Sequence, residues 1–331
     1  MRALFFALVT VVSLGIGVFS QAQTLIVGNK YEGTVSFIDL ESGQELKRAE
    51  TGGSPHELIV SPDKTKVVVV SYLEDGYVGK ELNVFDVATG KHLSKIDISP
   101  HQGPHGIAWL GDSRNIIVTT EETSDVIKVD VQKGEIVGAV STDQVGSHML
   151  ALSPDQKTAY VTSRGSDTFS VIDTESMQLK STLPAGEGPE AVWVSPNGAE
   201  LWIGNAHSKN IIIFDTGTLK QKETIDVGFL PIRIRFHPEG KSVAVADLNG
   251  NRVLIYDAKS RKQLQKIDVG SSGARQPASL LFSPDGKFLF VGSQRDGKVV
   301  EIDTGSWKIT RIFRAGQGSD GIEWSPVTIQ P

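Results

Sequence analysis

The chain has 331 residues, no cysteine, 34 glycines, 22% charged residues and a formal net charge of −6. The absence of cysteine excludes a disulfide framework, a cysteine-ligated zinc site, an iron–sulfur cluster and a thiol nucleophile. The acidic balance, without a block of Lys and Arg, gives no electrostatic footprint for nucleic acid.

The first 22 residues have the features of a cleavable export signal. Arg2 supplies the positive start, residues 3–19 are almost wholly apolar, and residues 20–22 (Ser-Gln-Ala) form a small-x-small cleavage site. A membrane anchor is the alternative, but the apolar run is at the short end for a helix that spans a bilayer. We therefore expect residues 23–331 to be exported, periplasmic or secreted, with no transmembrane anchor after cleavage.

An apolar run that ends in Asp recurs along the mature chain, with successive Asp residues 42 to 47 positions apart. The seven Asp residues are Asp39, Asp86, Asp130, Asp173, Asp215, Asp257 and Asp303. A turn resembling Ser-Pro-Asp-Gly separates most of the runs, as at residues 61–63 and 283–286. Repetition at a fixed period of this length indicates a solenoid, a propeller or an array.

Each repeat holds four short runs rich in Val, Ile and aromatic residues, separated by Gly, Pro, Asn and Asp. In one repeat these runs are Glu190–Val194, Glu200–Gly204, Ile211–Asp215 and Gln221–Asp226. Such runs predict β-strands joined by tight turns, and four strands per repeat are typical of a propeller blade. The predicted fold is all-β: one seven-bladed β-propeller domain, with four antiparallel strands per blade, over residues 23–331.

The phase of the repeats predicts how the ring closes. Thr24–Gly28 corresponds to the second strand of a blade, whereas Gly321–Trp324 corresponds to a first strand. We therefore expect the C-terminal strand to join the N-terminal blade as its innermost strand. This closure removes free sheet edges, which otherwise promote aggregation.

The repeats resemble the YVTN-type β-propeller repeat of YncE-like exported seven-bladed propellers. The matching stretches include residues 159–163 (Ala-Tyr-Val-Thr-Ser) followed by Phe169–Asp173, and Ile26–Asn29 followed by Val35–Asp39. The resemblance extends over residues 24–326 and implies the propeller fold. For function it implies an exported binding or surface protein, because the fold hosts unrelated chemistries and its members have mostly undefined activities.

Positions that differ between the repeats indicate where a site lies, because the shared positions build the scaffold. One such position lies five residues before each turn Ser, at the entry to the innermost strand. Around the ring, the residues at this position are Asp320, His56, His105, His148, Glu190, Ile232 and Ala278. We expect the first five, a polar arc, to stand together at the mouth of the central channel, and they are the candidate metal ligands.

Five further residues are candidates for binding a ligand. Arg164, His207 and Arg295 lie in loops between second and third strands, which open on the same face as the arc. Two residues before the turn Ser, where most blades are apolar, two blades carry Arg235 and Glu323. An unpaired charge is costly to bury, so these two indicate a wet channel or a bound partner.

Three interpretations of the polar arc stay open at this point. In the first, each imidazole bonds a neighbouring backbone group and stabilises the loop that enters its strand. In the second, the three imidazoles hold a divalent ion of Zn, Cu, Ni or Fe, with Glu190 or Asp320 as a fourth ligand or as a base for bound water. In the third, the imidazoles and nearby arginines bind a small anionic or aromatic ligand.

The leading functional hypothesis is an exported monomer that binds a small ligand, a metal ion or an exported protein partner at the channel mouth, without turnover. The first alternative is a metal-assisted hydrolase, lactonase or lyase, because similar propellers use His, Glu and a metal at this mouth; Glu190 is then the candidate catalytic base. The second is a tetrapyrrole-binding or structural surface propeller, although haem d1 propellers have eight blades. The chain has no G-x-S-x-G elbow, P-loop or H-E-x-x-H motif.

Overall fold

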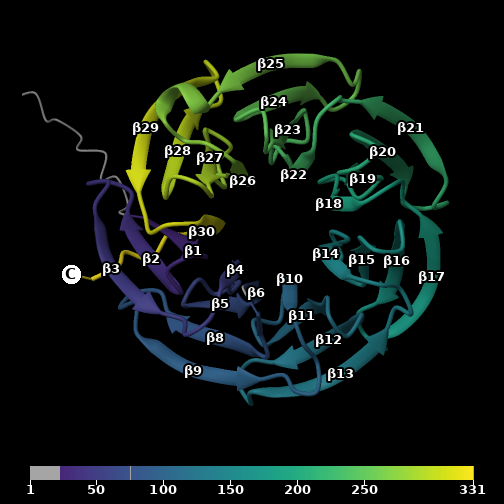
Figure 1. Ribbon diagram of the computed structural model, residues 1–331, viewed down its shortest axis with the longest axis horizontal. Coiled ribbons are helices and arrows are strands. Elements are labelled where there is room, and N and C mark those ends of the chain that lie inside the picture. Colours follow the sequence, from purple (N-terminus) through teal and green to yellow (C-terminus); the bar gives the residue numbers. More distant parts are fainter. Residues whose placement is uncertain (1–22, 75, 331) are drawn as a thin grey trace, which may run out of the picture.

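The computed structural model describes residues 23–74 and 76–330, and these residues form a ring of seven four-stranded antiparallel sheets (Figure 1). The predicted seven-bladed, all-β fold is confirmed. The predicted export signal, residues 1–22, lies outside the described residues. In the described chain, no helix has the length and apolar character needed to cross a membrane.

Each blade runs from an innermost strand beside the central channel to an outermost strand at the rim. Blade 1 contains β30 (Ser319–Ser325), β1 (Thr24–Asn29), β2 (Thr34–Asp39) and β3 (Glu45–Glu50). Blade 2 contains β4 (Pro55–Val60), β5 (Lys66–Ser71), β8 (Glu81–Asp86) and β9 (His92–Asp97). Blade 3 contains β10 (Pro104–Trp109), β11 (Asn115–Thr120), β12 (Asp125–Asp130) and β13 (Glu135–Ser141). Blade 4 contains β14 (Ser147–Leu152), β15 (Thr158–Ser163), β16 (Thr168–Asp173) and β17 (Gln178–Pro184).

The remaining blades follow the same order. Blade 5 contains β18 (Pro189–Val194), β19 (Glu200–Asn205), β20 (Asn210–Asp215) and β21 (Gln221–Asp226). Blade 6 contains β22 (Pro231–Phe236), β23 (Ser242–Asp247), β24 (Arg252–Asp257) and β25 (Gln263–Asp268). Blade 7 contains β26 (Pro277–Phe282), β27 (Phe288–Ser293), β28 (Lys298–Asp303) and β29 (Lys308–Arg314). A short hairpin of β6 (Leu73–Glu74) and β7 (Tyr77–Val78) interrupts blade 2, and a 3-10 turn, η1 (Gly270–Ser272), follows β25.

The burial of each strand follows its place in the blade. The second strands, such as β5 and β19, are apolar and almost wholly buried, because a neighbouring blade covers each face of the sheet. The outermost strands, such as β21, are mostly exposed and rich in Lys, Glu and Gln. The core therefore lies between blades, as where Phe169 of blade 4 and Phe214 of blade 5 pack with ring centroids 4.8 Å apart.

The ring closes as the repeat phase predicts. β30 pairs antiparallel with β1, with Trp324 opposite Leu25 and Ile322 opposite Val27. The tail beyond β30 is also held, because the amide of Ile329 donates to the Thr24 hydroxyl at 2.9 Å and the Ile329 side chain is buried. N- and C-terminal segments thus share one blade (Figure 1).

A β-bulge occurs in the innermost strand of every blade of the described chain. Each of these strands has one residue more than its partner strand between two successive pairings, as between Pro55 and Leu58 of β4. The extra residue falls within the segment that carries the arc position in all seven blades. A bulge breaks the alternation of side chains between the two faces of a sheet and redirects them. The bulges therefore give the chain a way to point successive side chains into the channel.

Candidate metal centre

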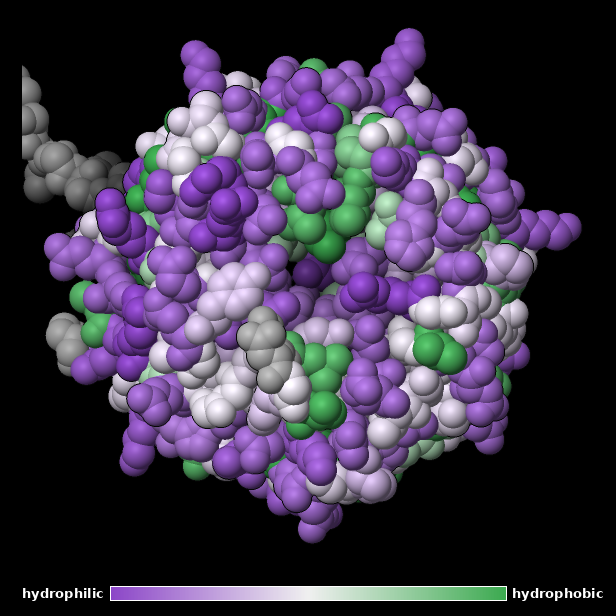
Figure 2. Space-filling model, in the orientation of Figure 1, coloured by the Kyte–Doolittle hydropathy of each residue, from purple (hydrophilic) through white to green (hydrophobic). Residues whose placement is uncertain are grey.

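The three arc histidines come together at the channel mouth, on the innermost strands of blades 2, 3 and 4. The ring centroids of His105 and His148 are 3.8 Å apart, and those of His56 and His105 are 4.2 Å apart. Gly106 permits this approach of β10 to β14, because a Cβ there would lie 2.9 Å from the carbonyl oxygen of His148. The three rings, tilted by 49° and 35° from one to the next, border a cavity of about 320 Å³. The face of the ring in Figure 2 is hollowed at its centre, with hydrophilic residues in the hollow.

His148 is held between two carboxylates. Its Nδ1 lies 2.7 Å from Glu121 Oε2, and its Nε2 lies 2.8 Å from Glu190 Oε1. Burial lowers the pKa of His148, but the two glutamates outweigh it and raise the pKa above its ordinary value. His148 and Arg164 in turn lower the pKa of Glu190 to about 2, against the effect of its burial. The group is therefore an imidazolium flanked by two carboxylates.

His105 has no such partners. Its side chain is 1% exposed, and neither ring nitrogen has a hydrogen-bond partner among the described residues. Burial, followed by the charges of His148 and His56, holds the pKa of His105 well below its ordinary value, so the ring is neutral. A buried polar atom without a partner costs about 1–3 kcal/mol, and such atoms call for a bound water, ion or ligand.

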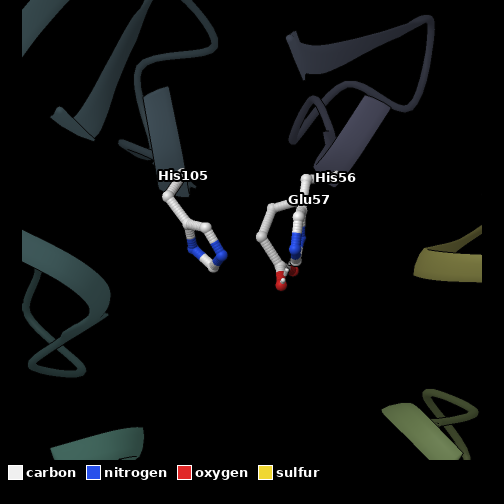
Figure 3. A group of neighbouring side chains, drawn as sticks. All are labelled: His56, Glu57 and His105. Carbon is white, nitrogen blue, oxygen red and sulfur yellow. Dashed lines mark ion pairs between the residues drawn. The ribbon is translucent and has the colours of Figure 1, made fainter. Parts of the chain in front are cut away.

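His56 faces His105 from blade 2 and shares its bulge with Glu57. His56 Nε2 lies 3.3 Å from Asp320 Oδ2. Its buried Nδ1 lies 3.7 Å from Glu57 Oε1 and has no hydrogen-bond partner within residues 23–74 and 76–330. Figure 3 shows His105 on one inner strand and His56 and Glu57 on the neighbouring inner strand, with all three side chains extending into the channel. Gly321 lets β30 approach β4, since a Cβ at that position would overlap the carbonyl oxygen of His56.

Two groups of three donor atoms, each within 4.8 Å of one another, occur among the described residues. One joins His56, Glu57 and His105, and the other joins His105 with Glu121 and His148. Neither contains all three imidazoles, and in each a glutamate replaces the third. In the second group, both nitrogens of His148 are bonded to carboxylates. The first group keeps imidazole nitrogens without a hydrogen-bond partner among the described residues, on His56 and His105.

An ion pair below the histidines divides the channel. Arg233 of blade 6 donates to Glu57 of blade 2, and its remaining nitrogens contact the Ala278 carbonyl oxygen at 3.2 Å and Met149 Sδ at 3.1 Å. Arg233 and His56 hold the pKa of Glu57 well below its ordinary value despite complete burial. This layer separates the mouth cavity from a second cavity of about 470 Å³ toward the opposite face.

The predicted ligand-binding residues are divided between the two cavities. Arg164 and His207 line the mouth cavity, and Arg164 Nε lies 3.3 Å from Glu190 Oε2. Arg235 and Glu323 line the second cavity instead. Arg295 is exposed and lines neither cavity, whereas the preceding Gln294 reaches Asp320 Oδ2 at 2.9 Å.

No ring nitrogen of the three arc histidines bonds a backbone group in the described chain, so the first interpretation of the arc lacks the contacts it requires.

Several residues of the site were not predicted from the sequence. Glu57 follows His56 directly, and strict alternation would send it to the other face of the strand. Tyr72 and Glu121 come directly after second strands, and the Tyr72 hydroxyl donates to Glu121. The feature that could have identified Tyr72 and Glu121 is their place in the loops that open on the mouth of the channel.

Burial raises the pKa of Glu323 in the second cavity from 4.5 to about 7. The folded protein therefore keeps this carboxyl protonated over a pH range in which the unfolded chain has lost the proton, and stability falls as pH rises from about 5 to 7. In Glu323→Gln we expect this loss to disappear. The variant then gains about 2–3 kcal/mol relative to the parent between pH 5 and pH 8, since a tenfold change in proton affinity is worth about 1.4 kcal/mol. Urea unfolding at both pH values measures this difference, and an unchanged difference contradicts the prediction.

Comparison with known proteins agrees with the fold. The family model of the YNCE-like beta-propeller matches residues 76–200, and that of the 7-bladed beta-propeller lactonases matches residues 231–320. A protein of unknown function from Desulfotomaculum acetoxidans DSM 771 superposes with a TM-score of 0.74 at 14% identity, over 91% of this chain and 98% of that one. Hydrazine synthase of Kuenenia stuttgartiensis does so with a TM-score of 0.71 at 18% identity, over 88% and 92%. No curated protein matches in sequence.

Proposed function

We propose that this seven-bladed β-propeller, which is similar to YNCE-like and lactonase propellers, binds one divalent transition-metal ion at its channel mouth, through His56, Glu57 and His105. The observation that carries the proposal is the neutral, buried His105, whose two ring nitrogens have no partner. Together with the predicted export signal, the proposal gives an exported metal-binding protein.

The donor set suits Zn, Cu, Ni or Fe, because two imidazoles and a carboxylate are nitrogen and oxygen ligands of these ions. Metal ligands must be deprotonated, and burial keeps His105 neutral while Arg233 keeps Glu57 ionised. Asp320 lies behind His56, where it can fix the orientation of the ring as carboxylates commonly do behind metal-bound histidines.

The charges around the mouth cavity are compatible with a bound cation. The carboxylates of Glu190 and Asp320 line this cavity, and those of Glu57 and Glu121 lie beside its histidines. They offset the four positive groups, which are Lys30, Arg164, Arg233 and the imidazolium of His148. No excess of positive charge therefore opposes the ion. Three protein ligands leave positions on the ion open toward the cavity, where a small ligand can bind it.

Removing His105 is the direct test of metal binding. Chelator-treated wild-type protein is expected to bind about one Zn²⁺ per chain in calorimetric titration. His105→Ala is expected to lose at least about 100-fold in affinity, since even a residue behind a metal ligand is worth 10–100-fold. His207→Ala, in the same cavity but outside both donor groups, is the matched control and should bind as the wild type does.

The result is interpreted only for variants whose circular dichroism and melting temperature match those of the wild type; His105→Asn is the second variant if His105→Ala misfolds. Wild-type protein that binds none of Zn²⁺, Cu²⁺ and Ni²⁺ contradicts the proposal. So does a folded His105→Ala that binds Zn²⁺ as tightly as wild type does.

A second candidate is metal-assisted lactone hydrolysis, and the lactonase match over residues 231–320 favours it. Water would add to the acyl carbon as the ring C–O bond breaks, giving the open hydroxy acid. A metal lowers the pKa of bound water, and the imidazolium of His148 is a positive charge in the same mouth that can stabilise the oxyanion formed on the acyl group. Metal-dependent acid release from δ-valerolactone, lost in His148→Gln, is the expected result; its absence rules out this activity on that lactone.

A further inference from the structure

The second cavity is the other hollow of the central channel, beneath the layer of Glu57 and Arg233. Its lining includes the position two residues before the turn Ser in each blade, which is occupied by Ile59, Ala108, Ala151, Trp193, Leu281, Arg235 and Glu323. Five of these seven residues are apolar. Its volume of about 470 Å³ lies within the range of small-molecule sites.

Arg235 is placed in this cavity without an ion-pair partner among the described residues. Its guanidinium lies 3.7 Å from the ring of Trp193, and its one hydrogen bond is to the carbonyl oxygen of the adjacent Ile234, at 3.1 Å. The remaining N–H groups of the planar guanidinium therefore have no acceptor in the part of the chain that the structure describes. Most other arginines near the channel, such as Arg233 and Arg164, are paired with glutamates.

We propose that this cavity binds a small aromatic carboxylate, with the carboxylate on Arg235 and the aromatic ring against Trp193 and the apolar side chains of the inner strands. A guanidinium presents a fork of donors that matches a carboxylate in a bidentate pair. The indole face holds that fork in place, because a cation over an aromatic ring is attracted to it. The apolar lining then favours a flat hydrophobic group over water.

The other charged groups near Arg235 are compatible with an anion. Glu323, the carboxyl in the same cavity, has a pKa raised to about 7 by burial, so below that pH it is neutral and does not repel a carboxylate. Glu57 lines the cavity but its charge is matched by Arg233. Lys64 adds a positive charge that acts on Glu323.

The experiment titrates wild-type protein with 2-naphthoate at pH 6 and compares its neutral isostere, 2-naphthamide. We expect 2-naphthoate to bind with about one site per chain and 2-naphthamide to bind at least about tenfold more weakly, since a charged hydrogen bond is worth 1.5–3 kcal/mol. Arg235→Met, which keeps an apolar side chain over Trp193, should lose at least about tenfold in 2-naphthoate affinity.

One further variant and one treatment of the wild type separate this site from the metal centre. His105→Ala and chelator-treated wild type should bind 2-naphthoate as wild type does, because the Glu57 and Arg233 layer lies between the cavities. Equal affinity for naphthoate and naphthamide overturns the assignment of a carboxylate. Folded Arg235→Met that binds naphthoate like wild type, or wild type that binds none at millimolar concentration, overturns the site.

Discussion

Truncation before Ser319 is expected to abolish folding of the ring, although it removes only the last 13 residues. The deletion takes away β30, and with it the inner strand of blade 1 and the pairing that joins the two ends of the chain. Far-UV circular dichroism and size-exclusion chromatography should show a loss of the native strand signal and aggregation, because β1 is left as an open edge.

The magnitude follows from the side chains that are lost. Ile322 and Ile329 are buried, and Trp324 and Val327 are partly buried against neighbouring blades. Burying a large apolar side chain contributes about 1.5–3 kcal/mol, so these four together supply roughly 4–10 kcal/mol. Most domains have a free energy of unfolding of 5–15 kcal/mol, so a loss of this size removes most of it.

The matched control for this truncation removes only the last two residues. Gln330 donates one backbone hydrogen bond to Ala88 and is otherwise exposed, so we expect this shorter deletion to cost about 1 kcal/mol or less. A chain truncated before Ser319 that melts cooperatively with native circular dichroism contradicts the closure argument.

The fold could be predicted from the sequence alone because the pattern of one blade occurs in it seven times. Each blade has its strands, its turn and its Asp at the same phase, so an error in one repeat is corrected by the others. The strands of blade 5 agree with the predicted runs to within one residue at each end. The ring closure also followed from phase, since Thr24 begins a second strand and residue 321 lies in a first.

The site was predicted only in part, because it depends on contacts between blades that the pattern within a repeat does not reveal. Comparing the residues at the arc position in the seven blades was enough to predict that the three histidines lie close together. The position of Glu57 depends on a bulge that suspends the alternation of side chains. Arg235 is separated from the mouth by its place further along the inner strand, whereas the layer between the two cavities depends on one ion pair between residues 57 and 233, which are far apart in the sequence. A single sequence carries no signal for such a pair.

Replacing Arg233 by Met is expected to destabilise the protein by about 3–5 kcal/mol, since it leaves the Glu57 carboxylate buried without its partner. Glu57 is 8% exposed and Arg233 4% exposed, so little of either group is open to bulk water in place of the lost contact. Urea unfolding of metal-free protein should show the loss as a lower midpoint with an unchanged slope.

The double variant Glu57→Met with Arg233→Met distinguishes the pair from the space it fills. Replacing both partners of a buried ion pair by apolar side chains is often neutral or stabilising, so the double variant should recover to within about 1–2 kcal/mol of wild type. Two results would show that the Glu57–Arg233 ion pair does not stabilise the layer between the cavities. One is an Arg233→Met variant whose free energy of unfolding is within about 1 kcal/mol of wild type, and the other is a double variant no more stable than the single variant.

The same double variant also tests whether the two cavities are independent. It removes Glu57, a proposed ligand of the metal, but keeps Arg235 and Trp193 in the second cavity. We therefore expect Zn²⁺ affinity to fall by at least about 100-fold while 2-naphthoate binding stays within about threefold of wild type. If both are lost in a variant that remains folded, the Glu57 and Arg233 layer supports the two sites as one unit and they are not separate.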